Sequence, residues 1–348
     1  MKPKPPDAGT TIDRPVAADA RRRAAFIPRA IKPEHIRDYG IVVVVVVVFA
    51  YFSFASPVFL TGQNLLNILF QNATIAIPAC ALTLVIIAGN FDLSIGAIFT
   101  FSGVLCAWSA VHWGVWWSFP VAILAGALMG LINGITITKL KVNAFLATLA
   151  SGLAFTGLAL AVSGGSQIIP TSPVFAFIGQ QSILGVPYPV ILTVVVAVVL
   201  QLILSYTVFG GRLYSVGGNP DAARISGLRV DGLVIATFVI TGAACGLAGM
   251  IDASMTNQGS ATNILGQNLP LAAIAAVAIG GTSIFGGVGS VWRTIVGVCL
   301  LGIITNGFNL LGVPSFWQDI VRGLLILVAV AISVSIGRLA KSSDGSTA

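Results

Sequence analysis

Long apolar stretches separated by short polar turns dominate the chain from residue 39 onward. Most are close to 20 residues long, the length that a helix needs to cross the hydrocarbon core of a bilayer. Backbone groups in lipid must be paired within their own segment, so even the valine-rich run 41–48 is predicted to be helical. The predicted spans are Tyr39–Leu60, Leu65–Ala88, Leu93–Val111, Val115–Thr138, Phe145–Ser163, Tyr188–Val208, Leu233–Ala253, Leu269–Ile284, Val291–Val313 and Ile320–Gly337.

Composition supports an all-α polytopic membrane protein of about ten transmembrane helices. The 348 residues are 56% hydrophobic and 8% charged, whereas a soluble domain has about 25% charged residues. The spans leave no room for a nucleotide-hydrolysing domain, and no phosphate-binding G-x-x-x-x-G-K-[ST] motif is present. The four cysteines and two histidines form no ligand or nucleophile pattern, so neither a metal site nor catalytic residues are predicted.

The basic residues predict the orientation of the chain. If the N-terminus is inside, 17 of the 18 Lys and Arg residues fall on the cytoplasmic side, as the positive-inside rule requires. Both termini are therefore predicted to be cytoplasmic, and the net charge of +7 is no sign of a nucleic-acid partner. Residues 1–38 are predicted to be a disordered basic tail, 39–338 the transmembrane domain, and 339–348 a second cytoplasmic tail.

A short internal sequence similarity suggests an inverted repeat of five spans. Residues 128–134 read LMGLING and residues 301–307 read LGIITNG. The two segments lie on the fourth and ninth spans, which run in opposite directions. Inverted repeats of this kind are common in transporters.

The longest internal cytoplasmic loop, residues 209–232, has the sequence features of a short helix. Asn219 is a good N-cap, Pro220 suits the first helical position, and Gly227 can end the helix. The predicted helix, Pro220–Ser226, is too short to be stable alone in water and needs a docking surface. It is either a lever that fits a groove on a cytoplasmic partner or a surface turn packed on its own helix ends.

Asp92 is the one carboxylate in the apolar neighbourhood between the second and third spans. A carboxylate within a membrane is costly and often functional. Alternatively, Asp92 or Asn90 caps the N-terminus of the third span, and the two roles are compatible. Phe99, Phe101 and Trp108 could stack on a bound solute, although such aromatics more often pack in the core or face lipid.

The cytoplasmic loop resembles the GGN-x-x-AAR-x-SG signature of permease subunits of ribose/galactose/xylose-type ABC importers. The positions that match this signature are Asn219, Ala222, Ala223, Arg224, Ser226 and Gly227. Further segments similar to this family are AGNFDLSIG at 88–96, IAAVAIGGTSIFGGVG at 274–289, NGFNLLGV at 306–313 and FWQDIVRGLLILVAV at 316–330. The resemblance covers most of residues 56–337.

The resemblance implies a homodimeric permease of the bacterial inner membrane that carries a monosaccharide or a similar polar solute. A separate cytoplasmic subunit would bind ATP and Mg, so no cofactor is expected in this chain, and an extracytoplasmic protein would deliver the substrate. The residues expected to couple to the ATP-binding subunit are Asn219, Pro220, Ala222, Ala223, Arg224, Ser226 and Gly227. The candidate pathway residues are Asn90, Asp92, Ser94, Phe99, Trp108 and Asn306.

The sequence also departs from the family. Pro270, Leu271 and Ala272 stand where members commonly have Glu-Leu-Asp, and Arg293 replaces a small residue. An ion-coupled secondary transporter is the alternative function, since inverted repeats occur there too. Ion coupling usually requires several ionisable groups within the membrane, and only Asp92 meets that requirement.

Overall fold

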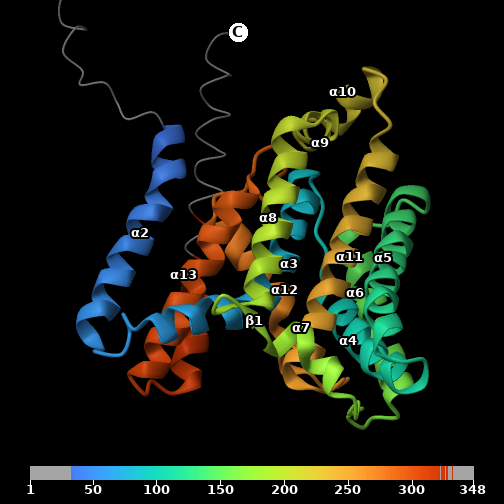
Figure 1. Ribbon diagram of the computed structural model, residues 1–348. Coiled ribbons are helices and arrows are strands. Elements are labelled where there is room, and N and C mark those ends of the chain that lie inside the picture. Colours follow the sequence, from blue (N-terminus) through green and yellow to red (C-terminus); the bar gives the residue numbers. More distant parts are fainter. Residues whose placement is uncertain (1–32, 322, 326, 328–330, 332–348) are drawn as a thin grey trace, which may run out of the picture.

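The computed structural model describes residues 33–321, 323–325, 327 and 331, and it shows a bundle of helices that run between two opposite ends (Figure 1). The long helices are α2 (Pro33–Ala55), α3 (Gly62–Ile87), α4 (Ile95–His112), α5 (Val115–Lys139), α6 (Ala144–Ser163), α8 (Tyr188–Tyr206), α11 (Val230–Thr256), α12 (Ile264–Ile279) and α13 (Val291–Leu310). The shorter elements are the 3-10 helix η2 (Pro173–Ala176), α7 (Phe177–Gln180), the hairpin strands β1 (Ser182–Ile183) and β2 (Val186–Pro187), α9 (Val208–Gly218) and α10 (Pro220–Ile225).

The all-α polytopic class is confirmed. Within the described part of the chain, seven helices are long and apolar enough to cross a membrane, and Ile41–Ala55 and Ile264–Ile279 are shorter apolar helices. These nine helices coincide with the first nine predicted spans. Most of the tenth predicted span lies outside the described residues, as do residues 1–32 of the predicted N-terminal tail and the whole predicted tail 339–348.

The predicted and observed bounds differ most for the first and eighth spans. Helix α2 begins at Pro33, six residues before the predicted start of the first span, because proline suits the first turn of a helix. Helix α12 lies about five residues earlier than predicted. The Asn263 side chain caps its N-terminus by accepting hydrogen bonds from the amides of Leu265 and Gly266, and Gly281, at φ +77°, follows its C-terminus.

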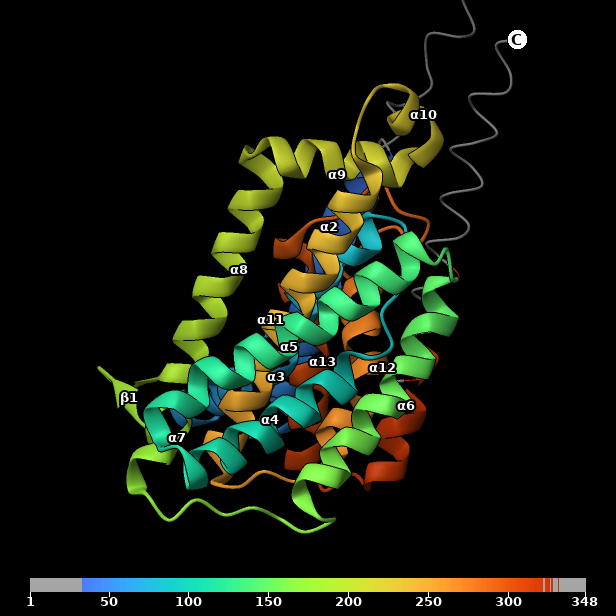
Figure 2. The same ribbon diagram turned by 90° about the vertical axis from the view of Figure 1, so that its right-hand side faces the viewer.

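The core lies around α3 and α11, which pack on each other at the centre of the bundle (Figure 2). Helix α11 also packs on α4 and α5, from the first half of the chain. Helix α3 packs on α12 and α13, from the second half. Helix α3 is the second span of the first half, and it lies against the third and fourth spans of the second half. Helix α11 is the second span of the second half, and it lies against the third and fourth spans of the first half.

Close backbone contact joins α5 and α11. Gly126 and Gly130 of α5 face Gly242 and Gly246 of α11, and a Cβ on Gly130 would overlap the carbonyl of Phe238. Small residues allow such an approach, which gains van der Waals contact where lipid supplies no hydrophobic force between helices.

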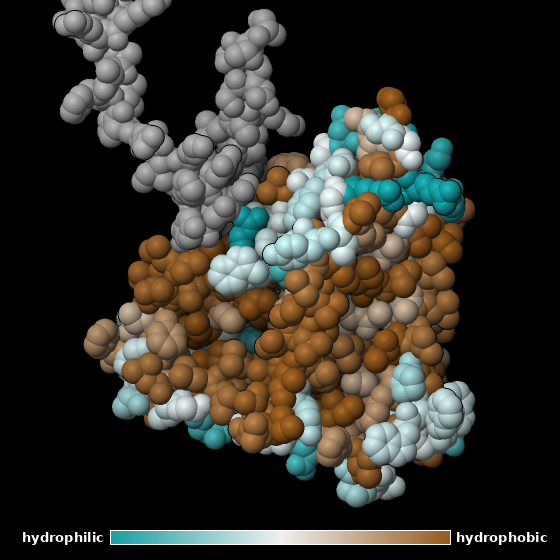
Figure 3. Space-filling view, turned by 45° about the horizontal axis from the view of Figure 1, so that its top comes forward, coloured by the Kyte–Doolittle hydropathy of each residue, from teal (hydrophilic) through white to brown (hydrophobic). Residues whose placement is uncertain are grey.

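The surface separates a wide apolar band from a polar end. In Figure 3 the brown band covers the middle of the molecule, and hydrophilic residues gather at the end that carries α9 and α10. That end also holds Lys139 at the last turn of α5 and Arg224 on α10. The pattern matches a bundle whose middle faces lipid and whose ends face water.

We expect Gly130→Ala to destabilise the protein, because the added methyl group would force α5 and α11 apart. Gly157→Ala is the matched control, since Gly157 also lies within a helix but has no atom within 4 Å of its added Cβ. The measurement is the thermal unfolding midpoint in detergent. The close-contact account is wrong if the two variants unfold at the same temperature.

Candidate functional site

The loop between α8 and α11 folds into two consecutive helices, α9 and α10, at the polar end. The Asn219 side chain accepts hydrogen bonds from the amides of Asp221 (3.1 Å) and Ala222 (3.0 Å), so it caps α10. Gly227, at φ +82°, ends the turn by donating its amide hydrogen to the Arg224 carbonyl. The predicted short helix is thus confirmed, with Ser226 as its C-cap rather than its last residue.

Helix α10 exposes one large apolar side chain to solvent. Ile225 is 89% exposed, and its neighbours Arg224 and Ser226 are polar and exposed. Ala223 points inward and is buried. Ile225 therefore projects into solvent from an otherwise polar surface.

Ion pairs at Asp231 connect α10 with α11 and α5. Asp231, in the first turn of α11, lies 3.2 Å from the Arg224 guanidinium and 3.3 Å from the Lys139 ammonium at the end of α5. The same Arg224 lies 3.8 Å from Asp221 within α10. Asp231 thereby links α5, α10 and α11 at the polar end.

Helix α9 was not predicted as a separate element, yet it connects α10 to the interior. A Cβ on Gly217 would overlap the Ile87 carbonyl at the end of α3 and would lie 2.5 Å from the Gly287 amide. The Tyr214 hydroxyl donates a hydrogen bond to the Gly289 carbonyl (2.8 Å). We call this contact of α9 with the end of α3 and the 280–290 loop the glycine junction.

The electrostatics of the junction keep Tyr214 a hydrogen-bond donor. Partial burial raises the pKa of the Tyr214 phenol, because the phenolate would lose hydration, and the nearby positive charge of Arg293 opposes that rise. Arg293, the cation that departs from the family pattern, is itself buried at the start of α13.

Asp92 and Ser94 lie together in the segment between α3 and α4. Asp92 is fully buried, and its Oδ1 accepts hydrogen bonds from the Ser94 amide (2.9 Å) and hydroxyl (2.5 Å). The Asn133 amide on α5 donates to Ser94 Oγ (2.7 Å). The other Asp92 oxygen, Oδ2, is buried without a hydrogen-bond partner among the described residues.

Neither Asp92 nor Asn90 caps α4. The N-cap position is Ser94, which makes no side-chain cap, and Asn90 donates instead to the Ala88 carbonyl (3.2 Å). Asp92 therefore stabilises the bend before the helix rather than the helix end itself.

The remaining candidate pathway residues do not converge on Asp92. Trp108 stacks on His112 near the far end of α4, with ring centroids 4.2 Å apart. Asn306 exchanges hydrogen bonds with Asn64 (2.9 and 3.0 Å), which joins α13 to the start of α3. Phe99 lines a polar cavity at the end of the bundle opposite α10.

Sequence reasoning missed Ile225, Asp231 and most residues of that cavity. Ile225 could have been found as the single large apolar residue in the run NPDAARISG. Asp231 carried a signal too, as an acidic residue in the first turn of a span that follows a basic loop. The cavity residues come from three distant segments and share no local motif.

Comparisons with known proteins agree with this architecture. Residues 64–330 match the family model described as the branched-chain amino acid transport system / permease component. The chain belongs to this permease family. The permease is a transporter component rather than an enzyme, and it is a multi-pass protein of the bacterial inner membrane.

Curated relatives are similar along nearly their whole length. The permease is 40% identical to the ribose import permease protein of Bacillus subtilis over 300 residues, covering 84% of this chain and 90% of that protein. It is 36% identical to the L-arabinose ABC transporter permease of Azospirillum brasilense, covering 84% and 86%. It is 30% identical to the xylose transport system permease of Haemophilus influenzae, covering 88% and 98%. No solved structure matches the chain.

We expect Asp231→Asn to lower the stability of the permease by less than about 1 kcal/mol, because its ion pairs are solvent-exposed. The measurement is thermal unfolding in detergent, with wild-type protein alongside. A variant that fails to accumulate, or that unfolds many degrees lower, would show that these ion pairs are a structural requirement.

Proposed function

We propose that this protein is the membrane permease subunit of an ATP-binding-cassette importer for a monosaccharide or a similar polar solute. The observation that carries the proposal is the full-length similarity to permeases named for ribose, L-arabinose and xylose. The description of the matching family names branched-chain amino acid transport and not sugar transport. The proposed substrate class therefore depends on the relatives that are named for sugars. They do not support the alternative of an ion-coupled carrier.

The proposed topology has ten spans, with both termini and the α9–α10 end in the cytoplasm. Its support is the distribution of positive charge among the described residues, since basic side chains gather at that end. Those charged residues are Lys139, Lys141, Arg212, Arg224, Arg229 and Arg293. The inverted repeat is proposed on the reciprocal packing of α3 and α11 with the other half of the chain.

Helix α10 is the proposed docking site for a cytoplasmic subunit that binds ATP and Mg. Its cap by Asn219 and its ion pairs to Asp231 hold it in place, while Ile225 projects outward. Force applied there would pass through α9 and the glycine junction to the end of α3 and to the segment that holds Asp92. The rest of the proposed assembly is a second copy of the chain and a substrate-binding protein at the opposite face.

We expect Ile225→Asp to abolish transport and release the ATP-binding subunit, because an anion would replace the apolar contact. The measurements are sugar uptake and co-purification of that subunit from membranes. Leu184→Asp is the matched control, since Leu184 is 100% exposed on the β1–β2 hairpin at the opposite end. The docking proposal fails if Ile225→Asp retains both activities, or if both variants lose them equally.

The substrate class is tested by uptake of radiolabelled D-ribose, L-arabinose, D-xylose, D-allose and L-leucine in cells that express the permease with its partner subunits. We expect saturable uptake of at least one sugar and none of leucine. Cells that lack the permease provide the background. Uptake of leucine without uptake of any sugar would contradict the proposed substrate class.

A further inference from the structure

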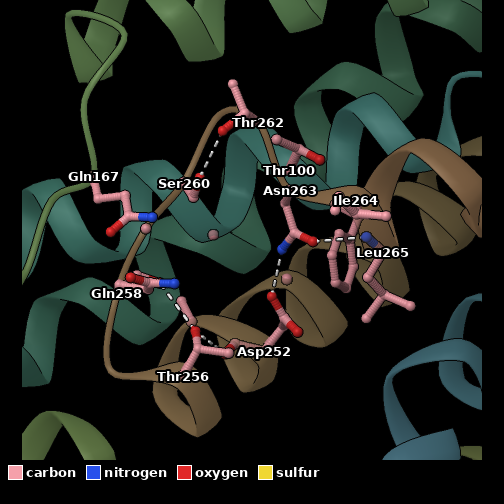
Figure 4. Close-up of a pocket in the computed structure, with 15 residues that line it drawn as sticks. Thr100, Gln167, Asp252, Thr256, Gln258, Ser260, Thr262, Asn263, Ile264 and Leu265 are labelled. Carbon is pink, nitrogen blue, oxygen red and sulfur yellow. Dashed lines mark hydrogen bonds between the residues drawn. The ribbon is translucent and has the colours of Figure 1, made fainter.

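A polar cavity of about 370 Å³ opens at the end of the bundle opposite α10. Its walls come from α4, the last turns of α11, the loop that leads into α12, and Gln167 of the segment after α6 (Figure 4). The volume is in the range of sites that hold small molecules. Among the candidate pathway residues, only Phe99 lines it.

Asp252 and Asn263 form a rigid polar corner of this cavity. The Asn263 amide donates to Asp252 Oδ2 (2.6 Å), and Asn263 Oδ1 accepts from the Leu265 amide (2.9 Å) at the start of α12. Both side chains are therefore oriented before any ligand arrives. Asp252 is only 9% exposed, and its second oxygen accepts no hydrogen bond from the described residues.

Further hydrogen-bonding groups at the cavity wall are unused. The side chains of Thr100, Gln167 and Gln258 make no hydrogen bond within the described part of the chain, although Thr100 is only 7% exposed. Thr100 is largely buried and needs a partner, which water or a ligand in the cavity must supply. Gln167 is exposed and Gln258 is half-buried, so these two side chains are open to water or to a ligand.

The chemistry of the lining favours a polyhydroxylated ligand. Carboxylate and amide oxygens accept hydrogen bonds from hydroxyl groups, and amide nitrogens donate to them. Phe99 also borders the cavity, but its side chain is only 1% exposed, so the polar groups supply the contacts to a ligand. An aliphatic amino acid side chain would leave most of these polar groups unpaired, at a cost.

We propose that this cavity is a site where the permease binds a monosaccharide on the outer side of the membrane, with hydroxyl groups paired to Asp252, Asn263 and Thr100. The proposal rests on the proposed function and adds to it the residues that receive the sugar. It places substrate contact within the permease itself, separate from the protein that delivers the substrate.

Occupancy is tested by protection of a cysteine at the cavity mouth. Thr262→Cys is labelled with a membrane-impermeant maleimide in the assembled transporter, with and without each sugar of the uptake panel, and with wild type as the background. We expect the transported sugar to slow labelling of Thr262→Cys but not of the control Ser182→Cys, which is exposed at the same end on the hairpin. Equal labelling rates with and without that sugar would overturn the proposal.

Function is tested by two conservative variants of the lining, Asp252→Asn and Thr100→Val. We expect Asp252→Asn to reduce uptake about tenfold at saturating binding protein, the size expected for one hydrogen bond to a charged group. Thr100→Val should reduce uptake less. Asp319→Asn, the same change at an exposed carboxylate outside the cavity, should transport normally.

ATP hydrolysis by the same complex separates sugar binding from two other outcomes. We expect Asp252→Asn to retain stimulation of hydrolysis by the loaded binding protein. Loss of that stimulation would show instead that the cavity docks the binding protein. Normal uptake by both lining variants would overturn the proposal while leaving the proposed function intact, and a wild type that imports no sugar would overturn both.

Discussion

The close approach of α5 and α11 through facing glycines is the constraint on which the rest of the structure depends. Lipid supplies no hydrophobic force between helices, so the bundle is held by packing and by paired polar groups. Helix α11, fixed in this way, carries a residue of each proposed site at its two ends. Asp231 pairs with Arg224 of α10 at the polar end, and Asp252 forms the polar corner of the cavity at the opposite end. One rigid helix thus connects the two proposed working surfaces.

A second connection runs through close glycine contacts at the end that carries α9 and α10. Gly217 of α9 contacts the end of α3 and the 280–290 loop so closely that no side chain fits, and Gly286 approaches Gly89 next to the Asp92 segment. A tightly packed contact transmits displacement, because it has no compressible space. Movement of α10 would therefore reach residues 88–94, between α3 and α4, and the 280–290 loop, between α12 and α13. This close packing explains why the sequence around residue 285 is rich in glycine, because a larger residue would not fit there.

Features carried by local sequence were predictable, and those made by tertiary contact were not. The first nine spans and the α10 helix follow from apolar length and from the Asn219–Pro220 cap. The position of α12 was misjudged because Asn263, which sets its start, lies among other polar residues without a distinctive pattern. Asp92 or Asn90 was the candidate cap of α4, but Asp92 bonds to Ser94 in the bend before the helix and Asn90 bonds to the Ala88 carbonyl. The cavity at the end opposite α10 combines residues 99–103, Gln167 and residues 249–265, which no single-sequence pattern brings together.

The central claim is that ATP hydrolysis by a partner subunit drives solute import through this chain. The most direct measurement is sugar uptake by proteoliposomes that contain the purified permease, its ATP-binding subunit and the binding protein, with no ion gradient. The account predicts uptake that requires ATP on the side of α10 and persists when ionophores abolish all gradients. Uptake by the permease alone in response to a proton or sodium gradient would contradict it.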